Sequence, residues 1–165
     1  MRSFFYLQFI IFEITVIHLA IIFMRKVSDI LTRKGSAVVT IDAATLVLDA
    51  LKLMAEKNIG AVVVTEHGEY AGILTERDYA RKVVLEGRSS DHTTAGEIMS
   101  TSIPRVLPEN TVENCMHIMT EGKLRYLPVF SYNKLQGIVS MSDVVTETIL
   151  SHEATIEQLQ NYIQS

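Results

Sequence analysis

The hydrophobic and polar positions of this chain repeat one pattern twice, in which short runs typical of strands alternate with runs typical of helices. The predicted strands are residues 37–41, 61–65 and 70–75 in the first copy, and residues 104–108, 126–130 and 135–140 in the second. An amphipathic helix, at residues 46–54 or 112–119, follows the first strand of each copy. Another helix starts at Thr75 or at Ser140. Each copy therefore has the order β-α-β-β-α, which predicts an α/β fold.

Short polar segments separate the predicted elements. The sequences EHGE at residues 66–69 and SYNK at residues 131–134 are typical of tight turns between paired strands. Gly122 stands where a glycine would cap the C-terminus of a helix. The last helix of the first copy is expected to end near Gly87, and residues 87–94 form a polar linker.

A shift of 65 positions superposes the two copies. The stretch LKLMAEKNIGAVVV at 51–64 falls on MHIMTEGKLRYLPV at 116–129, with Met, Glu and Val in matching places. Farther upstream, VSDIL at 27–31 resembles AGEIM at 95–99 at a slightly larger shift, which a loop insertion in the first copy explains. Because about 60 residues bury too little surface to be stable alone, we expect the copies to pack together as a pseudo-symmetric module.

The first 24 residues differ from the rest of the chain. Residues 3–23 are apolar apart from a few positions, with Glu13 as the one charge, and are long enough to cross a bilayer as a helix. Three interpretations remain open: a mis-assigned translation start upstream of Met24, an N-terminal apolar helix that anchors the protein in the inner membrane, or a buried helix. With an anchor, the basic residues that follow would keep the rest of the chain in the cytoplasm.

The C-terminal residues 152–165 are expected to form an amphipathic helix. Ile156, Leu159 and Ile163 recur at helical spacing between polar residues. Such a stripe is expected to pack on the module or on a partner protomer.

Composition and charge argue against several classes of function. The formal net charge of −4 and the pI near 5.7 disfavour nucleic-acid binding, which needs a basic face. Cys115 is the single cysteine and falls on the apolar face of a predicted helix, and the five histidines lack metal-ligand spacing, so we expect neither disulfides nor a metal site. No phosphate-binding loop, nucleophile elbow or metalloprotease motif occurs, so we expect no enzyme activity.

The same strand-to-helix corner occurs twice, as GILTERD at residues 72–78 and as GIVSMSD at residues 137–143. Thr75 and Ser140 can cap the helix that follows, and the aspartate three residues later can accept a hydrogen bond from the N–H of the capping residue. This capping box explains the spacing without a ligand. Alternatively, the short acid at a helix start accepts the two hydroxyls of a ribose, and the free N–H groups there suit a phosphate.

With its doubled β-α-β-β-α unit and its two corners, the chain resembles a tandem pair of CBS domains, named after cystathionine β-synthase. The stretch ILTERDYARKVVLEGRSS at residues 73–90 also resembles a subgroup of stand-alone two-domain proteins found in bacteria and plants. The resemblance covers residues 25–150 and implies one domain at 25–90 and another at 91–151. It also implies that clefts between the domains bind adenosine-containing ligands such as AMP, ATP or NAD(H), and that modules associate into disc-like homodimers.

The resemblance further implies which residues hold the ligand. In the family the corner aspartate holds the ribose hydroxyls, with a threonine or serine at the turn nearby. The matching residues here are Thr75 and Asp78 in one cleft, and Ser140 and Asp143 in the other. Candidates for phosphate groups are Arg125 and Arg77 first, and then Arg88. Gly60 and Ala61 are small enough to admit an adenine ring, although close packing would also explain them. Gly60 occupies the place of Arg125 in the other copy, and Ser142 that of Arg77, so the two clefts should not bind equally.

The leading hypothesis is a regulatory module without catalytic activity or an obligatory cofactor, which senses an adenine nucleotide or NAD(H). The alternative is a ligand-free module for dimerisation or protein interaction, with residues 3–23 as a possible membrane tether. One observation separates them. If the carboxylates of residues 78 and 143 fold back on their own helices and face no hollow, only a scaffold remains.

Overall fold

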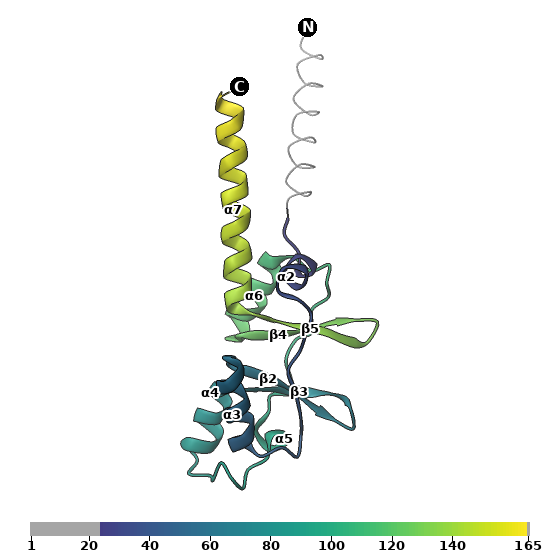
Figure 1. Ribbon diagram of the computed structural model, residues 1–165, viewed down its shortest axis with the longest axis vertical. Coiled ribbons are helices and arrows are strands. Elements are labelled where there is room, and N and C mark those ends of the chain that lie inside the picture. Colours follow the sequence, from purple (N-terminus) through teal and green to yellow (C-terminus); the bar gives the residue numbers. More distant parts are fainter. Residues whose placement is uncertain (1–23, 165) are drawn as a thin grey trace.

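The computed structural model describes residues 24–164, which form two lobes stacked along the long axis of the molecule (Figure 1). In chain order the elements are α2 (Val27–Lys34), β1 (Thr40–Asp42), α3 (Val47–Lys57), β2 (Ala61–Glu66), β3 (Glu69–Thr75), α4 (Glu76–Tyr79), the π-helix η1 (Ala80–Val84), α5 (Ala95–Ile98), α6 (Val112–Gly122), β4 (Tyr126–Ser131), β5 (Lys134–Ser140) and α7 (Met141–Gln164). The expected N-terminal apolar helix at residues 3–23 lies outside the described residues. Within residues 24–164, none of the helices combines the length and the hydrophobicity that a membrane span requires.

Each lobe is built on a β-hairpin, as the sequence predicts. In the lower lobe of Figure 1, β2 and β3 are antiparallel and β1 lies parallel to β2; in the upper lobe, β4 and β5 are antiparallel. The hairpin turns have positive φ angles at both central residues, 53° and 82° at His67 and Gly68, and 48° and 60° at Tyr132 and Asn133. Such angles give the tight turns that suit the twist of paired strands. The mixed α/β fold is therefore confirmed.

Two local predictions are wrong. The strand predicted at 104–108 is reduced to a single bridge, in which Val106 lies parallel to Val129. Prolines at both ends of that segment lack the N–H group that a longer ladder needs. The predicted glycine cap is also wrong, because Gly122 is the last residue of α6 and Lys123, with a φ of 52°, ends the helix.

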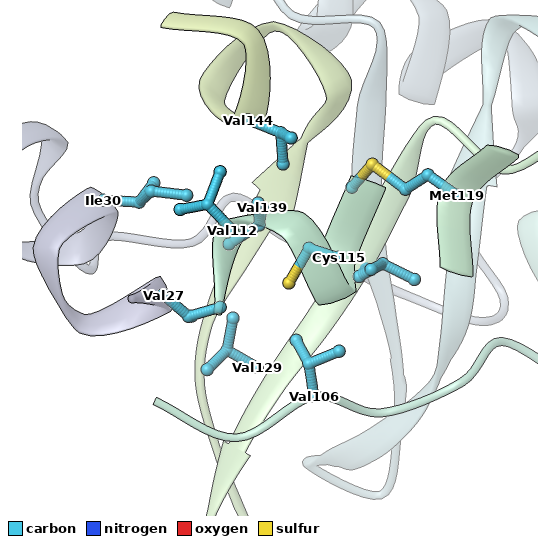
Figure 2. Packing of buried hydrophobic residues seen from close by; sticks show 10 residues of the cluster. Val27, Ile30, Val106, Val112, Cys115, Met119, Val129, Val139 and Val144 are labelled. Atoms are coloured by element: carbon cyan, nitrogen blue, oxygen red, sulfur yellow. The ribbon is translucent and has the colours of Figure 1, made fainter. Parts of the chain in front are cut away.

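The two lobes do not follow the two copies of the sequence, because each lobe takes a helix from the other copy. The first described helix, α2, contributes Val27 and Ile30 to the upper core, where they pack with Val144 of α7 (Figure 2). At the start of the second copy, α5 contributes Ala95 and Ile98 to the lower core. All five side chains are fully buried. The division at residues 25–90 and 91–151 thus describes the repeat in the sequence and not the packing.

The exchanged segments lie against the glycine at the start of each corner sequence. A Cβ atom on Gly137 would lie 2.6 Å from Leu31 Cδ2 of α2, and one on Gly72 would lie 2.7 Å from the carbonyl oxygen of Ser100, just after α5. At Gly72 the neighbouring atom is backbone, so β3 needs a glycine where the exchanged segment lies against it, whereas at Gly137 the neighbour is the end of a leucine side chain, which can move aside.

The last helix extends well beyond the upper lobe (Figure 1). Residues 152–164 continue α7 without a break, so the predicted C-terminal helix is part of a longer one. Ile156 and Ile163 are 55% and 81% exposed, so they do not pack on the module of their own chain.

A buried carboxylate joins α2 to α7. Glu147 is 1% exposed; its Oε2 accepts a hydrogen bond from Arg33 Nε at 3.1 Å, and its Oε1 lies 3.4 Å from Arg25 Nη1. A buried charge is tolerated only when cations neutralise it. These two arginines therefore hold the exchanged helix on the upper lobe.

Removing both arginines should destabilise the fold strongly. Arg25→Ala combined with Arg33→Ala would leave Glu147 buried without a partner, so the free energy of unfolding in urea should fall by about 3–5 kcal/mol. As a control, Lys52→Ala breaks an exposed ion pair with Asp49 and should cost no more than about 1 kcal/mol. Equal effects of the two changes would contradict the role of this buried pairing.

Candidate functional site

The predicted capping box forms at both corners. Thr75 precedes α4, and its N–H and hydroxyl donate to Asp78 Oδ2 at 3.1 and 2.5 Å, while the Asp78 N–H donates to Thr75 Oγ1 at 3.1 Å. Ser140 precedes α7 and makes the same three bonds with Asp143, at 2.8, 2.6 and 3.2 Å. An aspartate three residues after the cap is therefore long enough to close the box.

The two carboxylates differ in their remaining partners. Asp78 Oδ1 accepts a hydrogen bond from Ser100 Oγ at 3.0 Å and lies 2.9 Å from Lys82 Nζ, so all four acceptor positions of this carboxylate are occupied. Lys34 Nζ lies 2.7 Å from Asp143 Oδ2, the same oxygen that closes the box. Asp143 Oδ1 accepts no hydrogen bond from any of the residues 24–164. This oxygen is open to a ligand.

Neighbouring donors keep both carboxylates ionised. Burial raises the pKa of Asp78, but the hydrogen bond and the charge of Lys82, together with two hydroxyl donors, outweigh it and leave this pKa below its ordinary value. Burial likewise raises the pKa of Asp143, and Lys34 and Ser140 bring that pKa below its ordinary value. Both groups are therefore hydrogen-bond acceptors at neutral pH.

Each carboxylate lines a hollow between the two lobes. The Asp78 cleft, of about 660 Å³, is lined among others by Thr75, Arg77, Asp78, Arg81, Lys123 and Arg125. The Asp143 cleft, of about 290 Å³, is lined among others by Val38, Gly60, Ala61, Ile138, Ser140 and Asp143. A connecting groove of about 590 Å³ is lined among others by Arg77, Lys123, Arg125, Ser140 and Ser142. Both carboxylates fold back on their own helices, but each also lines a hollow. The scaffold interpretation required carboxylates that face no hollow, so this requirement is not fulfilled.

The structure gathers all but one of the predicted site residues in these hollows. The Asp143 cleft brings together Gly60, Ala61, Ser140 and Asp143. The Asp78 cleft brings together Thr75, Arg77, Asp78 and Arg125. Arg88 lies elsewhere: its Nη2 is 2.5 Å from Glu97 Oε1, and it lines none of the three hollows. Its guanidinium is held by this acid, which belongs to α5, the helix exchanged between copies.

Tyr126 is a site residue that the sequence did not single out. It lines both clefts and the connecting groove. A Cβ atom on Gly60 would lie 2.7 Å from the Tyr126 hydroxyl oxygen, so the missing side chain at Gly60 gives the tyrosine its place between the clefts. The repeat conceals this role, because Ala61 stands at the matching position of the first copy.

Three lysines were missed as well: Lys34, Lys82 and Lys123. In the sequence each has the pattern of an ordinary surface charge. Only the folded chain shows that two of them reach the corner carboxylates.

The single cysteine and the side chains that can ligate metals are the remaining candidates for chemistry among residues 24–164. Cys115 is buried, and its desolvation, with the nearby charge of Glu113, raises the pKa of the thiol to about 11. A protonated, buried thiol is a poor nucleophile. Among residues 24–164, no group of three or more His, Cys, Asp or Glu side chains is arranged to hold a metal ion.

Comparison with known proteins identifies the family. The model of the CBS domain matches residues 27–85 and 95–149, so the chain belongs to the CBS domain family and carries two tandem domains. The mitochondrial CBS domain-containing protein CBSX3 of Arabidopsis thaliana is 38% identical over 150 residues, which cover 84% of this chain and 71% of that protein. Stand-alone CBS domain pairs of bacteria and plants are generally regulatory ligand-binding modules and not enzymes.

Solved structures show the same fold. A protein with CBS domains from Burkholderia ambifaria MC40-6 is 45% identical, with a TM-score of 0.74, over 76% of this chain and 94% of that one. The hexameric CBS-CP12 protein from bloom-forming cyanobacteria is 32% identical, with a TM-score of 0.66, over 74% of this chain and 67% of that one.

The capping box of Asp78 should make stability depend on pH in acid. The folded pKa lies below the ordinary value of about 3.9, so the carboxylate stabilises the fold above that value, and the contribution is lost as the pH falls through the folded pKa. Asp78→Asn should be less stable than the unsubstituted protein at about pH 5. In urea denaturation the difference should shrink below about pH 3.9.

The exposed Asp49→Asn variant is the matched control and should change the free energy of unfolding by at most about 0.5 kcal/mol. A deficit of Asp78→Asn that stays the same from neutral pH into acid would contradict the stabilising role of the ionised carboxylate.

Proposed function

We propose that this pair of CBS domains is a regulatory module that binds an adenosine-containing ligand, AMP, ATP or NAD(H), with the nucleoside in the Asp143 cleft. The open carboxylate oxygen carries the proposal. Asp143 is fixed by its capping box through Oδ2, while Oδ1 has no partner among the described residues. A ribose offers two neighbouring hydroxyl donors, and an ionised carboxylate is a strong acceptor for them.

The Asp143 cleft suits a nucleoside in size and lining. Its volume of about 290 Å³ is close to the lower end of the range for ligand pockets, about 300–1,000 Å³. Val38, Ile59 and Ile138 supply apolar walls for a flat purine ring, and Gly60 and Ala61 leave room for it.

The phosphate groups of a nucleotide bound in this cleft would extend toward two arginines. The connecting groove shares Ser140 and Ser142 with the Asp143 cleft, and Arg77 and Arg125 line it as well. Arg125 forms no ion pair with any described residue. The planar guanidinium group matches the oxygens of a phosphate. A nucleotide should therefore bind more tightly than adenosine.

A ligand in this position would act on the arrangement of the two lobes. Gly60 belongs to the lower lobe and Asp143 to the upper one, and Arg77 Nη1 of the lower lobe donates to the carbonyl oxygen of Lys123 in the upper lobe at 2.9 Å. A ligand that contacts both lobes favours the arrangement in which all its contacts form. Its effect is limited to the difference between its affinities for the two arrangements.

Replacing one atom of the corner carboxylate should weaken nucleotide binding. Asp143→Asn keeps an oxygen for the capping box but places a donor where the ribose needs an acceptor. Hydrogen bonds to charged groups contribute about 1.5–3 kcal/mol, so the affinity for AMP, ATP or NAD(H) should fall at least about tenfold. Isothermal titration calorimetry measures this.

Asp91→Asn, in the exposed linker, is the control and should bind as the unsubstituted protein does. Thermal melting of each variant shows whether it is folded. If the folded, unsubstituted protein binds none of the three ligands, the proposal is wrong.

We also propose that α7 joins two copies of the chain, because its exposed face has the spacing of a coiled coil. Val145, Ile149, Ile156 and Ile163 are 45%, 52%, 55% and 81% exposed. The three isoleucines are seven residues apart, and His152 and Leu159 stand at the intermediate positions of the heptad in the sequence. Isoleucine thus recurs at one core position, and Val145, His152 and Leu159 occupy the other; a β-branched residue at the first position favours two parallel strands.

Charge and the extent of the family domains favour a second copy as the occupant. In a parallel pair, Glu153 at one flank of the stripe would face the position of Thr148, so no like charges meet. The stripe continues beyond residue 149, where the match to the CBS domain ends. The cyanobacterial CBS-CP12 relative is hexameric, so self-association occurs on this fold.

A charge in the middle of the stripe should separate the copies. Ile156→Glu would place two carboxylates together in the core of the coiled coil, so sedimentation velocity should show a monomer where the unsubstituted protein is a dimer. The control Gln158→Glu adds the same charge on the solvent side of the helix and should leave the dimer intact. A monomeric unsubstituted protein, or equal behaviour of both variants, would contradict the pairing.

A further inference from the structure

The Asp78 cleft carries an excess of positive charge on an acidic protein. Its positively charged lining residues are Arg77, Arg81, Lys82, Lys123 and Arg125. Its negatively charged lining residues are Glu76 and Asp78. The whole chain has a formal net charge of −4. The Asp143 cleft contains only Lys34 and Asp143 as charged groups, so the two hollows differ in charge by about three units.

The carboxylate of the Asp78 cleft is not available to a sugar. Thr75 fills the acceptor positions of Oδ2, and Ser100 and Lys82 fill those of Oδ1. A second hydrogen bond holds Lys82 in place, because its Nζ also donates to the carbonyl oxygen of Ile98 at 2.6 Å. A ribose would have to displace one of these donors, whereas Asp143 offers a free oxygen.

The cations of the Asp78 cleft, in contrast, are available. Arg81, Lys123 and Arg125 are exposed and form no ion pair within residues 24–164. Three unpaired cations around one hollow attract a multiply charged anion, and phosphate oxygens match both the arginine fork and the lysine ammonium group.

The Asp78 cleft and the Asp143 cleft each share lining residues with the groove between them. Arg77, Lys123 and Arg125 line both the Asp78 cleft and the connecting groove. Tyr126 borders all three hollows. A phosphate chain that follows the groove therefore reaches the cationic cleft without leaving the protein surface.

We propose that the Asp78 cleft is a polyphosphate pocket and not a second nucleoside pocket. Resting on the proposed function, the inference adds that ATP with its adenosine in the Asp143 cleft places its phosphate chain in the Asp78 cleft. The chain then binds one ATP and not two. Inorganic tripolyphosphate, which has no sugar or base, binds the Asp78 cleft alone.

Two variants separate the two pockets. Arg81 lines the Asp78 cleft and neither of the other hollows, so Arg81→Ala should weaken tripolyphosphate and ATP about tenfold and leave adenosine unchanged. Asp143→Asn should weaken adenosine and ATP and leave tripolyphosphate unchanged. Arg88→Ala is the control for the loss of an arginine outside the hollows, and calorimetry gives affinity and stoichiometry for each probe.

The outcomes distinguish this inference from the proposed function. Two ATP molecules per chain, with one lost in Asp78→Asn, would overturn the inference and leave the proposed function standing. No binding of tripolyphosphate, or equal effects of Arg81→Ala and Arg88→Ala, would also overturn it. Tripolyphosphate binding that depends on Arg81, without any binding of adenosine or nucleotides, would support the polyphosphate pocket and refute the proposed function.

Discussion

The exchange of one short helix between the two copies of the repeat is the constraint on which the rest of the structure depends. A copy of about 60 residues is only marginally stable by itself, and here each core is completed by a helix that the other copy supplies, α2 above and α5 below. The segment that follows α5 then lies against β3, which is why Gly72 has no room for a side chain, and Gly137 of β5 lies against Leu31 of α2. The buried Glu147, paired with two arginines, fixes one of these helices in place.

The same exchange places both capped corners beside hollows between the lobes. Each corner lies where a strand of one lobe ends near a crossing segment, so an acid that caps its own helix is also part of a cleft wall. Capping and ligand binding are therefore compatible at one carboxylate, because the box uses one oxygen and leaves the other. At Asp143 that second oxygen is open, and at Asp78 it is occupied by Ser100 and Lys82. The symmetry of the fold thus supports two chemically different sites.

Membership of the CBS domain family accounts for the two lobes but not for everything in the chain. The match to the domain ends at residue 149, whereas α7 continues to Gln164 with exposed isoleucines along one face. An apolar face in water is stabilised by a partner surface. This extension is the part of the described chain that distinguishes it most clearly from a minimal domain pair.

Much of the fold could be predicted because it is encoded by local spacing. The hairpins follow from turn residues between alternating runs, and the capping boxes follow from a hydroxyl and an acid three residues apart. Predictions that needed knowledge of neighbours failed more often. Arg88, for example, pairs with Glu97 because the exchanged α5 brings that acid within reach. The strand predicted at 104–108 failed for a local reason, because the prolines at its two ends limit the ladder to one bridge.

By itself, then, the sequence determined the two hairpins, the helices that flank them and the positions of both corners, and all but one of the site residues predicted from it line the hollows. Only the tertiary structure decided which lobe each short helix joins, which lysine reaches which carboxylate, and which carboxylate oxygen stays free. The physical reason is that periodicity shows which face of an element is buried but not the partner against which it is buried. Long charged side chains take their contacts from that partner.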